Sequence, residues 1–404
     1  MSTDALAGAE PAETGEQPRL LAVEIGDWPG LGNDVLLELG GRRTVLVGRN
    51  GAGKSLLVQG LHEAAFVPFM GPARRPPRHF RCDVALPGSA PVTYEYRVGS
   101  DEVPEELDVP SVEMPPRVPS WSERCQTMDD GSEVWRVEGS KLTVADGTIS
   151  PFLPGMGLLA IVGVMKVPVA VREIADSIRR LLRGFAMVPA GVPREDARRV
   201  EILVPRIGPS PSGSRRWGSV PGRVGMLAQA ITSMYESQRE RYDEFVALLC
   251  NLGVVREVSV EIYEDPREEP SADQRRDFAS VLFDGLNIGF QSDGTLRVAE
   301  IVRLLLRANA TCLLIEEPET AVHPGLLSKL LALMDSYGYD RQIIVSTHSP
   351  QVVDWCEPEQ LRLVERIDGN TQVRSLDPAD LGRVKRYLQD EGTFSDFVFG
   401  RSEG

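Results

Sequence analysis

The chain has 404 residues, of which 42% are hydrophobic and 25% charged, and its 59 acidic and 44 basic residues give a formal net charge of −15. These proportions are those of an ordinary soluble protein with a sizeable core, so they exclude a wholly disordered chain and suggest two or so domains. Five scattered cysteines and four histidines argue against a disulfide scaffold, a His/Cys zinc site and an HNH-type nuclease.

The predicted elements begin after an acidic segment, residues 1–18, which has neither the basic start nor the apolar stretch of a signal peptide. We expect a disordered tail there, no membrane span anywhere, and a cytoplasmic location. Residues 19–70 are expected to form the first part of the main domain, called the head below. It would hold strands at 20–25, 35–39 and 44–47 and a helix at 54–66.

Residues 71–225 differ in composition, being rich in Pro and Gly, and are interpreted as an insertion or lid that is β-rich and then Arg-rich. An amphipathic helix is expected at 171–182. Charge is segregated, because residues 101–138 carry a net charge of −8 and residues 172–223 carry +6.

Residues 226–404 are expected to complete the head. A helix is predicted over 224–252 and strands over 254–263 and 276–290. The further predicted elements are a helix at 295–307, strands at 312–315 and 343–345, and a helix at 323–334 between those strands. Strands that alternate with helices in this way predict an α/β fold, with a mixed sheet covered by helices.

The clearest motif is G-x-x-x-x-G-K-[ST], the Walker A pattern, between a predicted strand and helix. It comprises Gly48, Arg49, Asn50, Gly51, Ala52, Gly53, Lys54 and Ser55. Glycines let the backbone N–H groups of such a loop surround a phosphate at the start of a helix. Lys54 would then bridge the β- and γ-phosphates, and Ser55 would ligate Mg²⁺.

Two polar segments follow buried strands in the C-terminal part. Glu316 and Glu317 end the strand at 312–315, where Glu316 suits a Mg²⁺ ligand and Glu317 suits the general base that activates water. His348, in Ser-Thr-His-Ser-Pro, follows the strand at 343–345 and could bond a γ-phosphate oxygen or the attacking water. Each segment alone would also fit an ordinary solvated strand end.

Together the Walker A loop, Leu-Leu-Ile-Glu-Glu-Pro-Glu, the following His-Pro and Ser-Thr-His-Ser-Pro resemble the ABC-type ATPase heads of the RecF, OLD and SMC-like group. Gln-Ser-Asp-Gly-Thr-Leu-Arg at 291–297 stands where that group has its signature motif. The resemblance covers residues 19–70 and about 278–356. It implies a P-loop fold that binds ATP and Mg²⁺.

The resemblance also implies a homodimer with two ATP molecules between its heads. Ser292 and Gly294 of one head would contact the γ-phosphate that Lys54 of the other head binds. The alternative is a polar turn in which Ser292 or Asp293 only caps the next helix. Asp293 would repel a phosphate unless Arg297 or a cap hydrogen bond offsets its charge.

Relatives of such heads act in DNA repair and anti-phage defence, often with a nuclease. Only 56 residues follow His348, too few for a fused Toprim domain, so we expect a separate nuclease or other effector. Two alternatives stay open: a transporter ATPase subunit and a nucleotide-dependent interaction module with little turnover. Residues 172–223 could contact DNA, or could equally form a solvated or partner-facing surface.

Overall fold

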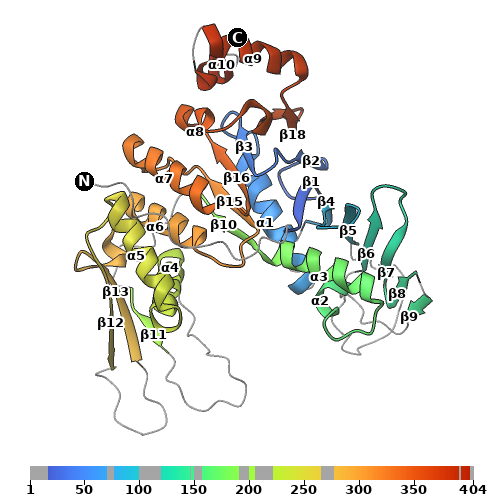
Figure 1. Cartoon of the computed structure of the whole chain (residues 1–404), viewed down its shortest axis with the longest axis horizontal. Helices are drawn as coiled ribbons and strands as arrows, with labels where there is room; N and C mark the ends of the chain where they lie inside the picture. Colours follow the sequence, from blue (N-terminus) through green and yellow to red (C-terminus); the bar gives the residue numbers. More distant parts are fainter. Residues whose placement is uncertain are drawn as a thin grey trace, which may run out of the picture. The chain divides into compact units, whose positions relative to one another are not determined.

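The computed structural model of the chain describes residues 17–70, 77–99, 120–145, 147–149, 157–190, 200–204, 222–264, 277–390 and 393–400. The chain forms two compact units, which are described one at a time. Unit 1 comprises Met1–Arg43, Arg49–Phe185 and Arg362–Ser375, and unit 2 comprises Thr44–Gly48, Ala186–Leu361 and Leu376–Gly404. The elements are labelled in Figure 1. Most of the predicted tail, residues 1–16, lies outside the described residues.

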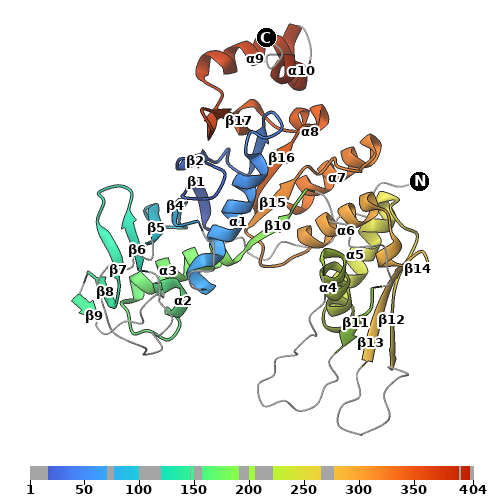
Figure 2. The ribbon, with the colours of Figure 1, turned by 180° about the vertical axis from the view of Figure 1, so that it is seen from behind.

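Unit 1 is built on an antiparallel sheet whose described strands run in the order β2-β1-β4-β5-β6-β7-β8-β9 (Figure 2). Their bounds are β1 Arg19–Gly26, β2 Val35–Glu38, β4 His79–Ala85, β5 Val92–Val98, β6 Trp121–Thr127, β7 Glu133–Glu138, β8 Lys141–Val144 and β9 Gly147–Ile149. Strands β4 to β9 lie in the region predicted to be β-rich and continue the sheet that β1 and β2 begin. That this region is an insertion or lid stays a prediction, as do the domain boundaries.

Alternation along the strands separates an apolar face from a polar face. The apolar face carries buried aromatic rings, including Tyr96, whose ring lies 5.1 Å from that of Trp121 and 5.6 Å from that of Phe80. The helices of the unit, α1 Lys54–Met70, α2 Leu158–Ile161 and α3 Val169–Arg183, pack on one another, and α1 packs on β1. A hairpin of β17 Leu361–Ile367 and β18 Asn370–Ser375 lies against β2.

Unit 2 has its own sheet, in which described strands follow the order β10-β15-β16-β3. The strands are β10 Phe185–Val188, β15 Cys312–Glu316, β16 Gln342–Thr347 and β3 Arg43–Val47. β15 and β16 are parallel and wholly buried, with α7 Pro324–Tyr337 between them in the chain. Helices α6 Asp293–Leu305 and α8 Pro350–Asp354 pack against α7. The predicted α/β class is therefore confirmed.

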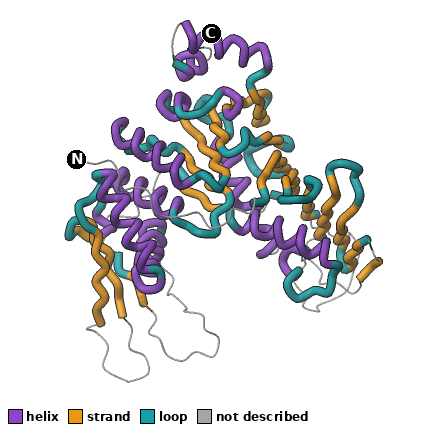
Figure 3. Tube along the Cα trace, in the orientation of Figure 1, coloured by secondary structure: helices purple, strands orange, loops and turns teal. Residues whose placement is uncertain are grey.

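A second, antiparallel sheet of unit 2 runs in the order β11-β13-β12 (Figure 3). It consists of β11 Ile202–Val204, β13 Asp277–Phe283 and β12 Val258–Glu264, with β14 Leu286–Asn287 paired to β13. The remaining helices are α4 Arg223–Ser237, α5 Arg239–Leu252, α9 Pro378–Asp390 and α10 Phe394–Gly400. None of the helices in the described part of the chain is long and apolar enough to cross a membrane.

Two predicted elements are interrupted in the structure. The helix expected over 224–252 is interrupted at Gln238, whose φ of −143° separates α4 from α5. The apolar spacing continues across the break because Tyr235 and Tyr242 still meet, with ring centroids 5.1 Å apart. The strand expected over 276–290 stops at Phe283, where Asp284 and Gly285 adopt positive φ angles and form a turn.

Glu123 is a buried acid on the apolar side of the unit 1 sheet. Glu123 belongs to β6 and is only 1% exposed. Its Oε1 accepts a hydrogen bond of 2.9 Å from the Trp135 indole N–H. A Cβ added at Gly157 would lie 1.8 Å from Oε2, so a glycine is needed to admit the carboxyl group. Burial raises the pKa of Glu123 to about 7.

We predict that Glu123→Gln stabilises the protein at pH 8 but not at pH 4. The wild-type pKa rises on folding from 4.5 to about 7, so stability falls as pH rises through that window. The amide avoids this loss, which is on the order of 3 kcal/mol. Denaturant unfolding at several pH values measures it. Glu138→Gln, at an exposed site of β7, should follow the wild-type pH profile, and a gain for Glu123→Gln that did not grow with pH would contradict the account.

Candidate functional site

Residues 49–55 of the Walker A loop belong to unit 1 and have the conformation expected of a phosphate loop. Gly51 and Gly53 adopt φ angles of +78° and +104°, which L side chains rarely adopt. The N–H of Ala52 donates to the Arg49 carbonyl at 3.2 Å, and the Lys54 ammonium group donates to the same oxygen at 3.2 Å. Helix α1 begins at Lys54, so its first backbone N–H groups lie at the loop.

Strand β18 supports this loop through one side chain. The hydroxyl of Thr371 donates to the Ala52 carbonyl at 3.1 Å, while the Thr371 N–H donates to the Leu31 carbonyl at 2.7 Å. A Cβ at Gly53 would lie 2.2 Å from the Thr371 hydroxyl oxygen. Glycine is therefore required at position 53 both for its backbone angle and for this close approach.

The acidic strand end lies within unit 2, where the register of β15 and β16 places Glu316 opposite Ser346. Glu316 is 1% exposed and its Oε2 accepts a hydrogen bond of 2.6 Å from the Ala190 N–H. The Ser346 hydroxyl is buried and has no hydrogen-bond partner among the described residues. A buried carboxylate beside an unsatisfied hydroxyl is an oxygen-rich pair that suits a hard cation.

Glu317 is held in a strained conformation directly after β15. Its φ is +42°, in the left-handed region that a glutamate seldom occupies. Its N–H donates to the Ser346 carbonyl at 2.7 Å, and its carbonyl accepts from the Arg297 guanidinium at 3.2 Å. The Thr320 hydroxyl donates to its Oε2 at 3.0 Å. Both the backbone and the carboxylate of Glu317 are therefore fixed.

Glu319 joins the two strand ends. Its Oε1 accepts hydrogen bonds from the Thr347 hydroxyl at 2.7 Å and from the His348 N–H at 2.8 Å. No role follows for Glu319 from the sequence alone, although its place two positions after Glu317 in the same acidic run is a usable signal. Glu316, Glu317 and His348 are thus brought together in unit 2, and Glu319 is the residue that connects them.

The signature segment begins α6, and its serine caps that helix. The Ser292 hydroxyl accepts a hydrogen bond of 3.1 Å from the Thr295 N–H. This is the geometry expected if Ser292 caps the helix, the alternative given above to a phosphate contact. A Cβ at Gly294 would lie 2.2 Å from the Ala321 carbonyl oxygen, so Gly294 allows the start of α6 to approach the loop after β15. A contact of Ser292 and Gly294 with nucleotide stays a prediction.

Arg297 has a different role from the one the sequence suggested. It is 2% exposed, and its guanidinium donates to the carbonyls of Pro189 and Glu317. Burial lowers its pKa to about 10, whereas the nearby Glu300 carboxylate opposes that shift, so the side chain stays protonated at neutral pH. Arg223 pairs with Glu300 at 2.6 Å. Arg297 thereby secures Glu317, rather than serving only as a counter-charge for Asp293.

The residues fit Mg²⁺-nucleotide in two places. The curled loop with Lys54 and Ser55 at the start of α1 suits phosphates, and Glu316 with the Ser346 hydroxyl suits the ion. Gly48 belongs to unit 2 and directly follows β3, which is hydrogen-bonded to β16. The first loop residue thus follows the strand next to β16, which ends at Thr347 and is followed by His348.

Comparison with known proteins gives one family match. Residues 252–354, about a quarter of the chain, match the family described as AAA domain, putative AbiEii toxin, Type IV TA system. The matched segment contains Ser292, Glu316, Glu317 and His348. The description of that family names an AAA domain, in agreement with the ATPase-head resemblance seen in the sequence. No curated protein matches the chain.

Among solved structures, the chain is similar to an SMC head bound to the C-terminal winged-helix domain of ScpA, with 13% identity, a TM-score of 0.43, and 90% and 99% of the two chains covered. The chain is also similar to the SMC head domain from Thermotoga maritima, with 12% identity and a TM-score of 0.37, and the match covers 89% of this chain and 99% of that one. The match to an ATP-binding subunit of an ABC transporter has 14% identity and a TM-score of 0.38, and it covers 94% of this chain and 98% of that one. TM-scores below 0.5 do not establish a common fold over the whole chain.

We predict that Gly53→Ala destabilises the protein more than Gly51→Ala does. Both substitutions place a side chain at positive φ, which costs roughly 1–2 kcal/mol. Only position 53 adds a clash with Thr371, since nothing lies within 4 Å of a Cβ at Gly51. Urea unfolding measures the difference. Thr371→Ala should recover part of the loss in Gly53→Ala, whereas equal losses at 51 and 53 with no recovery would contradict this packing.

Proposed function

We propose that this protein is an ATPase that binds Mg²⁺–ATP at its Walker A loop and hydrolyses it to ADP and phosphate. The observation that carries the proposal is the fixed carboxylate of Glu317, held at positive φ beside Glu316 at the end of a buried parallel strand. Strain of this kind persists where surrounding contacts enforce it and is frequent at catalytic sites. A binding module without turnover has no need of a carboxylate fixed in this way.

Each residue has a role in this proposal. The loop N–H groups and Lys54 bind the phosphates, and Ser55 and Glu316 hold Mg²⁺, whose positive charge stabilises the transferred phosphoryl group. Glu317 accepts the proton of the attacking water. His348 hydrogen-bonds a γ-phosphate oxygen or that water, and Glu319 fixes its backbone through the 2.8 Å bond. Glu319 and Arg297 are positioning residues.

The same proposal includes an ATP-dependent homodimer. The 13-residue helix α6 begins directly after its cap, Ser292, and Gly294 lies in its first turn. Its N-terminus is therefore in the segment expected to meet the partner's γ-phosphate. A helix N-terminus carries partial positive charge that favours a phosphate. The capping role and the phosphate contact are compatible, because a serine hydroxyl accepts from one group while donating to another.

In the cell, we propose a motor or sensor in anti-phage defence or DNA repair that acts with a separate effector such as a nuclease. The description of the matched family names a putative toxin of a toxin–antitoxin system, which favours defence over the transporter alternative. DNA contact through residues 172–223 has narrower support. Arg172 bonds the Met165 carbonyl, Arg183 lies over the Phe69 ring, and Arg223 pairs with Glu300. Arg215 and Arg216 lie outside the described residues.

We expect Glu317→Gln to lower ATP turnover at least about 100-fold while ATP affinity stays within about threefold, because the amide keeps the shape and removes the base. Phosphate release and binding of a fluorescent ATP analogue measure the two quantities. Glu365→Gln is the matched control and should retain wild-type turnover, because Glu365 lies in β17 and forms an exposed ion pair with Arg374 of β18. Undiminished turnover in Glu317→Gln would refute the assignment of the base.

The dimer is tested with Ser292→Asp in the Glu317→Gln background. Aspartate is as good a helix cap as serine, so α6 should be preserved while a negative charge is placed toward the γ-phosphate. Ser292→Asn keeps the cap without charge and is the control. We expect light scattering to detect ATP-induced dimers of the Ser292→Asn variant and only monomers of the Ser292→Asp variant. Equal dimerisation of both variants would count against a signature contact at Ser292.

The effector is tested by purification from the native host with and without ATP. A nuclease that co-purifies in an ATP-dependent manner is the expected result. A membrane permease would establish the transporter alternative. A chain that remains alone with ATP bound and no turnover would establish the interaction module.

A further inference from the structure

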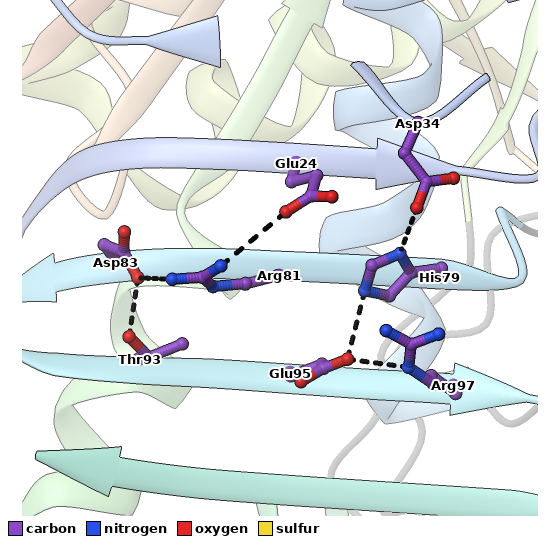
Figure 4. Close-up of polar contacts among 8 residues, drawn as sticks. All are labelled: Glu24, Asp34, His79, Arg81, Asp83, Thr93, Glu95 and Arg97. Carbon is purple, nitrogen blue, oxygen red and sulfur yellow. Dashed lines mark hydrogen bonds and ion pairs between the residues drawn. The ribbon is translucent and has the colours of Figure 1, made fainter. Parts of the chain in front are cut away.

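A second group of charged side chains lies on the polar face of the unit 1 sheet, across β1, β4 and β5 (Figure 4). The pairing of β1 with β4 places Gly26 opposite His79 and Glu24 opposite Arg81. The pairing of β4 with β5 places His79 opposite Arg97 and Arg81 opposite Glu95. Since alternate residues of a strand share a face, these side chains point to the same side. Asp34 joins them from just before β2.

His79 is the centre of this group and is only 7% exposed. Its Nε2 lies 3.1 Å from Glu95 Oε1, an oxygen that also accepts from Arg97 Nε at 2.7 Å. Its Nδ1 lies 3.1 Å from Asp34 Oδ2. A neutral imidazole that donates from Nε2 to Glu95 has a lone pair on Nδ1. A lone pair that faces the carboxylate of Asp34 would be repelled by it, so a positive charge must lie between the two atoms, either a proton on Nδ1 or a metal ion.

Glu24 completes a set of three donor groups around that point. One ligand atom from each of Glu24, Asp34 and His79 lies within 4.8 Å of the other two. Zn²⁺ bonds to nitrogen and oxygen are about 2.0–2.2 Å long, so tetrahedral ligands stand about 3.4 Å apart. The Nδ1–Oδ2 distance of 3.1 Å is near that value already, and Glu24, which also pairs with Arg81 at 3.8 Å, offers its ligand atom within 4.8 Å of both.

Charge and backbone geometry around the set favour a cation. The eight residues of Figure 4 include the carboxylates of Glu24, Asp34, Asp83 and Glu95, against the guanidinium groups of Arg81 and Arg97. With His79 neutral, two negative charges remain, which a divalent ion balances. A Cβ at Gly26 would lie 2.1 Å from Asp34 Oδ1, so glycine allows the Asp34 carboxylate to lie over β1. The group lines a cavity of about 270 Å³ that is open to solvent.

We propose that Glu24, Asp34 and His79 form a binding site for a divalent transition-metal ion such as Zn²⁺, with Glu95 orienting the imidazole. A histidine ligand commonly donates its other ring N–H to a carboxylate, which fixes the tautomer and strengthens the ligand, and Glu95 is placed to accept it. One nitrogen and two oxygen ligands with an open position fit zinc better than Mg²⁺ or Ca²⁺, which prefer oxygen alone.

The site would hold the connection between β1 and β2 to the sheet. That connection contains Leu31, whose carbonyl accepts from Thr371, and Asn33, whose N–H donates to the Asn370 side chain at 3.2 Å. Thr371 in turn supports Ala52 in the Walker A loop. The metal site is therefore a structural one that stabilises the support of the loop, and it does not depend on the proposed hydrolysis.

The test is Zn²⁺ binding to the chelator-treated full chain without nucleotide, in excess Mg²⁺, followed by a competing chromophoric chelator. We expect one equivalent of Zn²⁺ per chain and a higher melting temperature on loading, since a ligand of the folded state stabilises it. Asp34→Asn and His79→Gln should weaken binding at least tenfold and lose the thermal shift. Glu95→Gln should weaken binding about tenfold while still binding one equivalent.

Two controls separate this site from others. Glu133→Gln removes a carboxylate of similar exposure that pairs with Arg136 in β7, and Cys250→Ser removes the one cysteine of the chain that is not buried. Both should bind Zn²⁺ as wild type. Circular dichroism of the metal-free variants checks that they are folded. If His79→Gln unfolds the protein, Glu24→Gln replaces it as the variant that removes a ligand. No binding by the wild-type chain, or equal binding by Asp34→Asn and wild type, would establish a protonated His79 between two carboxylates instead.

Discussion

The parallel pairing of β15 with β16 is the constraint on which the candidate site of unit 2 depends. It sets Glu316 opposite Ser346 and brings the loops after both strands to one edge of the sheet. Glu319 then joins those loops, because one carboxylate oxygen accepts from both Thr347 and His348. A slip of one residue would turn Glu316 to the other face and separate these contacts. Wholly buried apolar residues on both strands prevent such a slip.

Two non-glycine residues at positive φ lie where the chemistry is proposed. Glu317 at φ +42° and Ala321 at φ +60° follow β15, and a strained residue costs of order 1–3 kcal/mol. The hydrogen bonds to Ser346 and Arg297 offset that cost for Glu317. Arg297 is itself costly to bury, so its carbonyl partners and Glu300 compensate for its charge. The site is therefore stable only as a connected set of contacts.

Much of the head could be predicted from the sequence, because local patterns specify it. Gly51, Gly53 and Lys54 mark a loop between a strand and a helix, and the apolar runs before Glu316 and Ser346 mark buried strands. The break at Gln238 could not be predicted, since Tyr235 and Tyr242 keep the helical spacing on either side of it. Arg297, Glu319 and the group around His79 also escaped prediction. Their partners are distant in the sequence, and only the tertiary packing of helix α6 and the register of the strands bring them together.

The sharing of one site between two copies is the central claim that remains to be measured. The most direct measurement is ATP turnover after mixing Lys54→Ala with Ser292→Asp, each inactive alone. A mixed dimer contains one site with the intact Walker A loop of the Ser292→Asp chain and the intact signature of the Lys54→Ala chain. The account predicts that turnover appears on mixing, up to a substantial fraction of the wild-type rate. Turnover that stays absent in mixtures shown to form heterodimers would contradict it.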